Sequence, residues 1–450
     1  MTFTLRPSTI KIQQGLMNSY RRNPNMALLT VKTGGGKTYG AIHTFGSMYK
    51  NAVLLVFTTS KVAKSKQWEQ SVKDYNQVMG TDLKIICYNY DKLVSQKFLN
   101  ELFARLKTVL QYPIVLILDE VHRIKLASSG KLSKRATILT KIARQDFIKT
   151  TLGLSATAFS NSYLDVATYL IIAGYYRSKS EYMHKHVKRF NEYWAPIVTD
   201  RFGNISRDAF KNPDQIDREI AQITTYVDTS NYMPQLTGVH QYFELNKEDK
   251  HLYNRIAIAY AQGQFEFPMQ ARMSQEHLLS NRLARQKDEY LLHILHMREN
   301  GAFERKTPIL IFYQYTTCFK HLKGLLHNMY PDYDIKAING SAHLDASDLS
   351  KPDNDNSIYL IQYEAGGEGL DWQWSNLSVF YEAPVRYEKF EQAKGRNLRN
   401  KSIMPHVYHY YLEYVKTLDG ERWDVNRSKR DFTETVAENT FLQNLPKKNS

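Results

Sequence analysis

Residues 31–38 read Val-Lys-Thr-Gly-Gly-Gly-Lys-Thr and decide the fold class that we expect for this chain. They follow an apolar, β-rich run over 26–31 and precede a helix-compatible segment, the strand–loop–helix order of a phosphate-binding loop. Glycines let successive backbone N–H groups curl around phosphate oxygens. Lys37 is expected to reach the β- and γ-phosphates, and Thr38 to ligate Mg²⁺. The predicted nucleotide-binding residues here are Thr33, Gly34, Gly35, Gly36, Lys37 and Thr38.

Val31 stands where the pattern G-x-x-x-x-G-K-[ST] has its first glycine, so the strict form is not met. The alternative is a plain glycine-rich turn before a helix. A second motif favours the nucleotide site, because residues 119–122 read Asp-Glu-Val-His after the apolar run 114–118. Carboxylates at the end of a buried strand are costly unless paired, and Mg²⁺ held through Asp119 removes that cost. Glu120 is then expected to orient or deprotonate the attacking water, and His122 to couple the site to a second domain.

The chain alternates β-rich and helical segments twice, which predicts an α/β fold with two parallel-sheet domains in tandem. Domain 1 is expected over residues 1–165, followed by a helical linker or insertion over 166–230. Domain 2 is expected over 231–425, with a helical insertion at 247–300, and 426–450 reads as a tail. The predicted strands are 26–31, 52–58, 84–88, 114–119 and 151–155, then 239–244, 309–313, 334–338, 357–362, 377–381 and 407–412.

The net charge is +15, from 60 Lys and Arg against 45 Asp and Glu, and it favours a polyanionic partner such as nucleic acid. A generally basic protein without such a partner is the alternative. We expect no membrane segment, because no apolar run approaches the roughly 20 residues that span a bilayer. The N-terminus lacks a signal-peptide pattern, and two distant cysteines give neither a zinc module nor a disulfide framework. A cytoplasmic location is therefore expected.

The predicted second domain carries Gln392, Arg396 and Arg399 on a segment that reads as a helix. Arg396 and Arg399 are three residues apart, so on a helix they share one face. Guanidinium groups stay ionised and form forked hydrogen bonds, which suits the charge that develops on a transferring phosphoryl group. Taken alone, two such arginines are more often a solvated basic face.

As a set, these motifs resemble the superfamily-two helicases, and within them the switch/sucrose-non-fermenting translocases. Residues 32–38 resemble motif I, and residues 119–125 resemble motif II. The other matching segments are Leu5-Arg6-Pro7 with Gln13 or Gln14 (adenine recognition), 58–60 with Gln67-Trp68 (motif Ia), 154–161 (motif III), 312–314 (motif IV), 366–370 (motif V) and Gln392, Arg396 and Arg399 (motif VI).

The resemblance implies two RecA-like domains with ATP and Mg²⁺ in the cleft between them and nucleic acid across both. It implies catalytic roles for Lys37, Asp119, Glu120, His122, Gln392, Arg396 and Arg399. It adds Gln13, Gln14, Gly369 and Asp371 to the nucleotide-binding residues. The residues implied to contact nucleic acid are Thr59, Ser60, Lys61, Trp68, Ser155, Thr157, Gln314, Gly366 and Gly367.

The resemblance favours DNA over RNA through the Arg-Ile-Lys that follows the acidic motif. The compact size is similar to that of bacteriophage-encoded helicases, which implies replication or recombination in the host cytoplasm, partner proteins from those processes, and a monomer or weak oligomer. An RNA-dependent ATPase of the same superfamily is the alternative. A non-catalytic nucleic-acid-binding subunit is a further one, against which intact Lys37, Asp119, Glu120 and Arg399 count.

Overall fold

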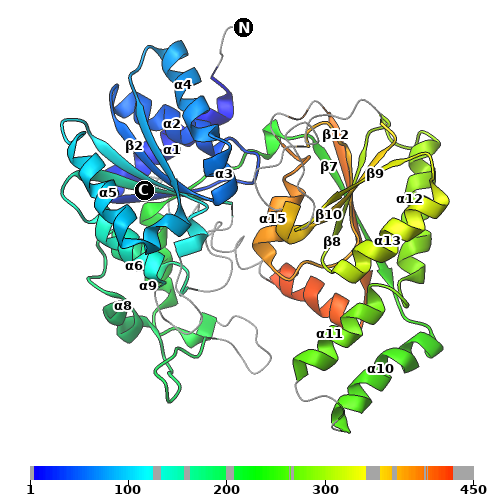
Figure 1. Ribbon diagram of the computed structural model, residues 1–450. Coiled ribbons are helices and arrows are strands. Elements are labelled where there is room, and N and C mark those ends of the chain that lie inside the picture. The colour runs from blue at the N-terminus through cyan, green and yellow to red at the C-terminus, as the bar shows by residue number, and fades with distance from the viewer. Residues whose placement is uncertain are drawn as a thin grey trace, which may run out of the picture. The chain divides into compact units, whose positions relative to one another are not determined.

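The computed structural model describes residues 5–124, 133–156, 163–198, 207–262, 264, 268–340, 355–366, 372–399, 402 and 404–428. These residues form two compact units, and the chain passes from the first to the second between Tyr232 and Met233. Each unit is built on a six-stranded parallel sheet with helices on its faces (Figure 1). The predicted fold class, α/β with two RecA-like domains in tandem, is confirmed. No helix among the described residues is both long and apolar enough to cross a membrane.

The sheet of the first unit has the strand order β3-β2-β4-β5-β1-β6. Its central strands are fully buried apolar runs, as expected for parallel strands that are covered on both faces. The five strands predicted for this domain are all present, with ends shifted by at most three residues. The strands are β1 (Met26–Thr30), β2 (Val53–Thr58), β3 (Lys84–Asn89), β4 (Ile114–Asp119), β5 (Ile148–Ser155) and β6 (Thr224–Tyr226).

Two hydrophobic layers cover this sheet. One layer joins α1, α2 and α4 to the face that presents Leu54 and Val56, and the other joins α5 to α9 to the face that presents Leu55 and Phe57. The helices are α1 (Pro7–Arg22), α2 (Lys37–Met48), α3 (Ser60–Lys64), α4 (Gln67–Met79), α5 (Gln96–Lys107), α6 (Lys134–Ala143), α7 (Ala167–Ile172), α8 (Lys179–His186) and α9 (Pro213–Ile223). Short 3₁₀ turns are η1 (Tyr90–Val94), η2 (Val121–Ile124), η3 (Arg207–Ala209) and η4 (Ser230–Tyr232).

The segment 166–230 differs from the predicted linker, because its described residues belong to the first unit. Helices α7, α8 and α9 pack in the core of that unit. Strand β6 pairs with β1, with Leu28 opposite Thr224, and completes the edge of the sheet. The sequence prediction missed β6 because three residues, Thr-Thr-Tyr, are too short to show a strand pattern.

The sheet of the second unit has the order β7-β12-β11-β8-β10-β9. Strand β7 lies at an edge and alternates exposed with half-buried residues, whereas β8, β10 and β11 are buried. All six predicted strands of this domain are present. They are β7 (Gln235–Phe243), β8 (Ile309–Tyr313), β9 (Asp334–Ile338), β10 (Ser357–Gln362), β11 (Leu377–Phe380) and β12 (His406–Tyr414).

Helices α12 and α13 cover one face of this sheet, and α15 covers the other together with the helical residues 418–428 (Figure 1). Helices α10 and α11 form a hairpin that packs through a small cluster around Tyr253 and Leu279. The helical prediction for 247–300 is confirmed for the described residues. The helices are α10 (Lys247–Ala261), α11 (Pro268–Leu279), α12 (Arg285–Glu299), α13 (Thr316–Met329), α14 (Tyr363–Gly366) and α15 (Tyr387–Lys394).

Candidate nucleotide site

The loop between β1 and α2 has the backbone of a phosphate-binding loop. Gly34 and Gly36 have φ values of 80° and 93°, in the left-handed region that favours glycine. A Cβ atom on Gly35 would lie 2.4 Å from Cγ1 of Val31, so a side chain at that position would clash. Helix α2 begins at Lys37, and a helix N-terminus presents N–H groups and a positive dipole end to an anion. Among the described residues, no side chain accepts a hydrogen bond from the N–H groups of Gly34, Gly35 or Gly36.

Val31, the departure from the strict motif, has a structural role in the loop. Its side chain is buried against Gly35, and its carbonyl oxygen accepts a hydrogen bond from Nζ of Lys37 at 3.3 Å. This bond holds the half-buried Lys37 side chain back over the loop. Thr38 lies half-buried in the first turn of α2. The loop therefore brings together an ammonium group, a hydroxyl and backbone N–H groups, of which the N–H of Gly35 donates to the carbonyl oxygen of Lys32 at 3.0 Å.

Asp119 ends β4 with its carboxylate held from several sides. Oδ2 accepts hydrogen bonds from Thr58 Oγ1 at 2.8 Å and from Trp68 Nε1 at 3.2 Å, and Oδ1 accepts from the N–H of Glu120 at 3.1 Å. Burial, together with the nearby Glu120 charge, raises the pKa of Asp119 above its usual range. The two side-chain hydrogen bonds and the charge of Lys37 act in the opposite direction. Asp119 is therefore a half-buried carboxylate with a raised pKa, for which a bound cation would be favourable.

Glu120, His122 and Ser155 form a polar chain next to Asp119. Glu120 has a φ of 52°, in the left-handed region, which is unusual for a residue with a side chain. Its Oε2 lies 3.3 Å from Nδ1 of His122, which in turn lies 3.2 Å from Oγ of the buried Ser155. These polar contacts join the end of β4, the turn η2 and the end of β5. They therefore link motif II to motif III within the first unit.

The residues at this site fit a Mg²⁺–nucleotide complex. Mg²⁺ prefers oxygen ligands and is usually held by one or two carboxylates together with substrate phosphates. Asp119 would supply the carboxylate and Thr38 the hydroxyl. No group of three or more His, Cys, Asp or Glu residues that could hold a metal is present in the described part of the chain. A metal ion here would therefore depend on the phosphates of the nucleotide.

Three of the four motif Ia residues predicted to contact nucleic acid lie at the start of α3. Thr59 caps this helix and accepts a hydrogen bond from the N–H of Val62, and Ser60 donates to Asp91 at 2.9 Å. Lys61 is exposed. Trp68 is placed differently, because its side chain is 1% exposed and its indole N–H is bonded to Asp119. A buried indole cannot stack on a base, so the structure makes Trp68 a support for the acidic motif.

The adenine-recognition residues predicted from resemblance lie on α1. Gln13 is half-buried and Gln14 is exposed. Ile12 on the same helix packs against Gly40 of α2, where a Cβ atom would lie 2.4 Å from Cγ2 of Ile12. This close approach sets α1 beside the helix that begins at the phosphate loop.

The motif VI residues of the second unit do not share a helix face, contrary to the sequence prediction. Helix α15 ends at Lys394, because Gly395 caps it, and Arg396 and Arg399 lie in the turn beyond. Gln392 is in the helix and buried, as is the side chain of Arg396. Nε of Arg399 donates to the carbonyl oxygen of Gly395 at 2.8 Å. Glycine is a poor helix former, which accounts for the stop between Gln392 and the arginines.

Gln314, the predicted motif IV contact, lies in the turn between β8 and α13. Its side-chain oxygen accepts a hydrogen bond from the N–H of Val385 at 3.3 Å. Its own N–H and that of Tyr315 donate to Oε2 of the buried Glu382, at 2.7 and 3.0 Å. The sequence analysis did not single out Glu382, and no local pattern announces it. Gly366 ends α14, and Thr157, Gly367, Gly369 and Asp371 lie outside the described residues.

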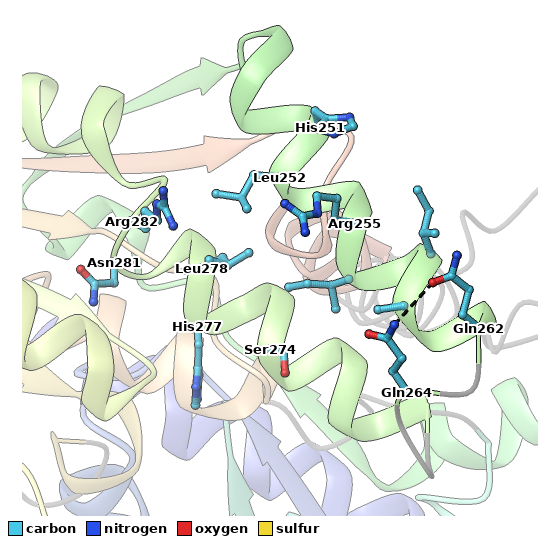
Figure 2. A pocket seen from close by; sticks show the side chains of 13 residues that line it. His251, Leu252, Arg255, Gln262, Gln264, Ser274, His277, Leu278, Asn281 and Arg282 are labelled. Atoms are coloured by element: carbon cyan, nitrogen blue, oxygen red, sulfur yellow. Dashed lines mark hydrogen bonds between the residues drawn. The ribbon is translucent and has the colours of Figure 1, made fainter.

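A hollow of about 870 Å³ lies between α10 and α11, and its lining contains none of the predicted site residues (Figure 2). Its aliphatic lining includes Leu252, Ile256 and Leu278. Two arginines and two histidines, and no acidic residue, are among the described residues that line it. These residues are His251, Arg255, His277 and Arg282. The hollow has the charge of a surface that faces anions.

Two protein-family models match the chain. Residues 2–160 match the type III restriction enzyme res subunit, and residues 286–401 match the helicase conserved C-terminal domain. A comparison with curated proteins found no match. Among solved structures, the chain is similar to the Sulfolobus solfataricus SWI2/SNF2 ATPase core in complex with dsDNA, with 15% identity and a TM-score of 0.38 over 99% of this chain and 96% of that one. That score is too low to carry an argument. The two domain matches support a nucleic-acid-dependent ATPase that binds ATP.

Proposed function

Because both units contain helicase-family domains, we propose that this chain is an ATP-dependent DNA motor, either a helicase or a double-stranded DNA translocase. The observation that carries the proposal is the half-buried Asp119 carboxylate at the end of β4, in the same unit as a glycine loop with the backbone of a phosphate-binding loop. Fold alone would not support an activity, since parallel α/β sheets host many chemistries.

In the proposed reaction, the glycine loop and Lys37 bind the β- and γ-phosphates of ATP. Thr38 and Asp119 hold the metal, and Mg²⁺ bound there neutralises charge on the phosphates. Glu120 orients the attacking water and accepts its proton. His122 lies next to both Glu120 and Ser155, so it is placed to relay changes at the nucleotide to the end of β5.

We assign Gln392, Arg396 and Arg399 of the second unit to the developing phosphoryl charge. An arginine in this role is worth about 10³–10⁵ in rate. Because these residues come from the other unit, hydrolysis would require the two units to close around ATP. Nucleic acid bound to both units would favour closure. The contacts proposed for it are Ser60, Lys61 and Thr157 in the first unit and Gln314, Gly366 and Gly367 in the second. Thr59 and Ser155 are buried, as Trp68 is, so they are proposed to support these contacts rather than to make them.

The net charge of +15 and the cationic hollow between α10 and α11 support a polyanionic partner. DNA is favoured over RNA by the resemblance of the segment after the acidic motif. A role in replication or recombination, as in the compact bacteriophage helicases that the chain resembles, belongs to the same proposal. The second candidate is an RNA-dependent ATPase, which the same motifs would serve.

The deciding experiment measures ATP hydrolysis by the full chain with double-stranded DNA, single-stranded DNA and RNA in parallel. Stimulation by either DNA above that by RNA is the expected result. Stimulation by RNA alone would replace the proposal with the second candidate. Hydrolysis that no nucleic acid changes would contradict both. The Lys37→Ala variant is the control for a contaminating ATPase.

A further inference from the structure

A short hairpin with an aromatic tip follows α8 in the first unit. Phe190 and Pro196 form an antiparallel bridge, and the N–H of Asn191 donates to the carbonyl oxygen of Ala195 at 2.9 Å. The turn between them contains Tyr193 and Trp194. The function proposed above uses none of these residues. We call residues 190–196 the aromatic hairpin.

Tyr193 is 81% exposed and Trp194 is 74% exposed, the two highest values among the exposed large hydrophobic residues described. The other four tryptophans, Trp68, Trp372, Trp374 and Trp423, are all buried. One edge of Trp194 is near Phe190, with ring centroids 6.0 Å apart. Two adjacent aromatic rings held in water are unfavourable for an isolated protein and typical of a contact site.

The turn holds its shape through hydrogen bonds and an unusual backbone conformation. Oδ1 of Asn191 accepts from the N–H of Tyr193 at 3.0 Å and from that of Ala195 at 2.8 Å. The N–H of Trp194 donates to the carbonyl oxygen of Asn191, and Trp194 has a φ of 57°, in the left-handed region. Such a conformation is disfavoured for a bulky residue and often marks a functional position. Specific hydrogen bonds therefore give the tip a defined conformation.

The base of the aromatic hairpin is anchored in the core of the first unit. Val187 pairs with Phe210, and both are buried in the main hydrophobic cluster. The buried His186 lies 2.6 Å from the Tyr176 hydroxyl, and burial lowers the pKa of His186 to about 4, so its imidazole is neutral at pH 7. The segment that leads into the hairpin is therefore fixed in the core of the first unit.

Three exposed cationic residues, Lys185, Lys188 and Arg189, precede this hairpin in the sequence, and Glu192 is the one acidic residue within it. Exposed aromatic rings beside cations are the combination with which proteins hold single nucleic-acid strands, because rings stack on bases while the cations meet phosphates. An acidic protein segment could pair with the cations, but it would offer the two aromatic rings no planar group on which to stack.

We propose that the aromatic hairpin stacks Tyr193 and Trp194 on bases of the DNA and separates its strands as the motor advances. The inference rests on the proposed DNA motor and adds strand separation to it. A rigid tip tied to the core can interrupt base stacking while ATP hydrolysis moves the strand past it. Loss of one aromatic stack lowers affinity about 5- to 150-fold, so the tip contributes measurably to holding an unpaired base.

The first test follows tryptophan emission while a single-stranded DNA oligonucleotide is added to the full chain without ATP. Quenching is expected in the natural chain and should be largely lost in Trp194→Phe, because the other tryptophans are buried. Binding is followed independently by anisotropy of a labelled oligonucleotide. Equal quenching in both proteins, or binding without quenching, overturns the stacking. Stacking without DNA-stimulated ATP hydrolysis would instead refute the proposed motor and leave the base contact standing.

The second test measures strands displaced per ATP hydrolysed, with a labelled duplex that carries a single-stranded tail on either end. Tyr193→Ala with Trp194→Ala is expected to lower this ratio at least about tenfold. The paired Phe substitutions should restore most of it, and Tyr242→Ala, on an exposed ring of β7, should leave it near the natural value. An unchanged ratio in the double alanine variant overturns the strand-separating role. So does a natural chain that hydrolyses ATP on DNA but displaces no strand. Thermal unfolding checks that each variant is folded.

Discussion

The turn after β1 in the first unit and the turn after β8 in the second both lead from a buried strand into a helix, but they differ in how their N–H groups are used. In the second unit, Glu382 places its carboxylate on the N–H groups of Gln314 and Tyr315. In the first unit, the described residues place no side-chain acceptor on the N–H groups of Gly34, Gly35 or Gly36. The turn after β8 is closed by a carboxylate of the chain itself, whereas in the turn after β1 the N–H of Gly35 donates to the carbonyl oxygen of Lys32 and the proposed anion is a phosphate from solution.

The difference teaches that parallel-sheet construction does not by itself create a nucleotide site. Burial raises the pKa of Glu382, while hydrogen bonds from Ser280, Tyr315 and Gln314 act in the opposite direction, so the second turn is already matched to a carboxyl group. In the first turn, Gly34 and Gly36 have left-handed φ values, and a side chain on Gly35 would clash with Val31. The difference agrees with the proposal that the first unit binds ATP and that the second contributes charge and nucleic-acid contacts.

The largest expected effect is the fall in kcat when Arg399 is replaced. If the second unit contributes only charge to the transition state, Arg399→Ala should lower kcat by about 10³–10⁵ with little change in ATP affinity. The measurement combines DNA-stimulated ATP hydrolysis with equilibrium binding of ATP. Arg386→Ala, at the exposed start of α15, is the matched control and should behave like the natural chain. A loss of ATP affinity without a loss of kcat would mean that Arg399 binds ATP in the ground state. The second unit would then contribute to ATP binding, contrary to the comparison.

Glu120→Gln should come next, with a fall in kcat of about 10²–10⁴ and ATP binding retained. Glutamine preserves the shape of the side chain but cannot accept a proton from water. The same two measurements apply, with Glu101→Gln on the exposed side of α5 as the control. Near-natural turnover in Glu120→Gln would remove Glu120 from the reaction and would leave Asp119 as the only acidic residue assigned to the site.

Local sequence patterns predicted the first unit's site better than the second unit's. The glycine loop and Asp119–Glu120 are runs of neighbouring residues at strand ends, so their position follows once the strands are recognised. Glu382 lies 68 residues from the Gln314 that it holds, and Trp68 lies 51 residues from Asp119. Such partners are brought together only by the tertiary fold. A single glycine, Gly395, also ended α15 earlier than the apparent helical spacing of Arg396 and Arg399 predicted.

Replacing Glu382 tests whether the turn after β8 needs an anion on its N–H groups. Glu382→Ala leaves the N–H groups of Gln314 and Tyr315 without their acceptor, so the free energy of unfolding should fall by about 2–4 kcal/mol. Glu382→Gln keeps an acceptor oxygen and should lose less. If the turn needs an anion, sulfate should stabilise the alanine variant more than the glutamine variant. Urea unfolding in chloride and in sulfate at equal ionic strength measures both effects, and an alanine variant as stable as the natural chain would contradict the assignment.

The smallest effect concerns the support of Asp119 by Trp68. Proposed metal binding requires Asp119 to be ionised, so kcat/KM should fall as the pH drops through the raised pKa of Asp119. The Trp68 indole donates a hydrogen bond to the charged form and thereby lowers this pKa. Trp68→Phe removes the bond, so the pKa should rise further and the acidic limb of the kcat/KM profile should move to higher pH. Tyr75→Phe on the same helix, whose hydroxyl lies 3.0 Å from His43, is the control and should leave the limb in place. A limb that stays fixed in Trp68→Phe, or moves to lower pH, would show that the indole does not tune Asp119, and Trp68 would then have only a packing role in the core of the first unit.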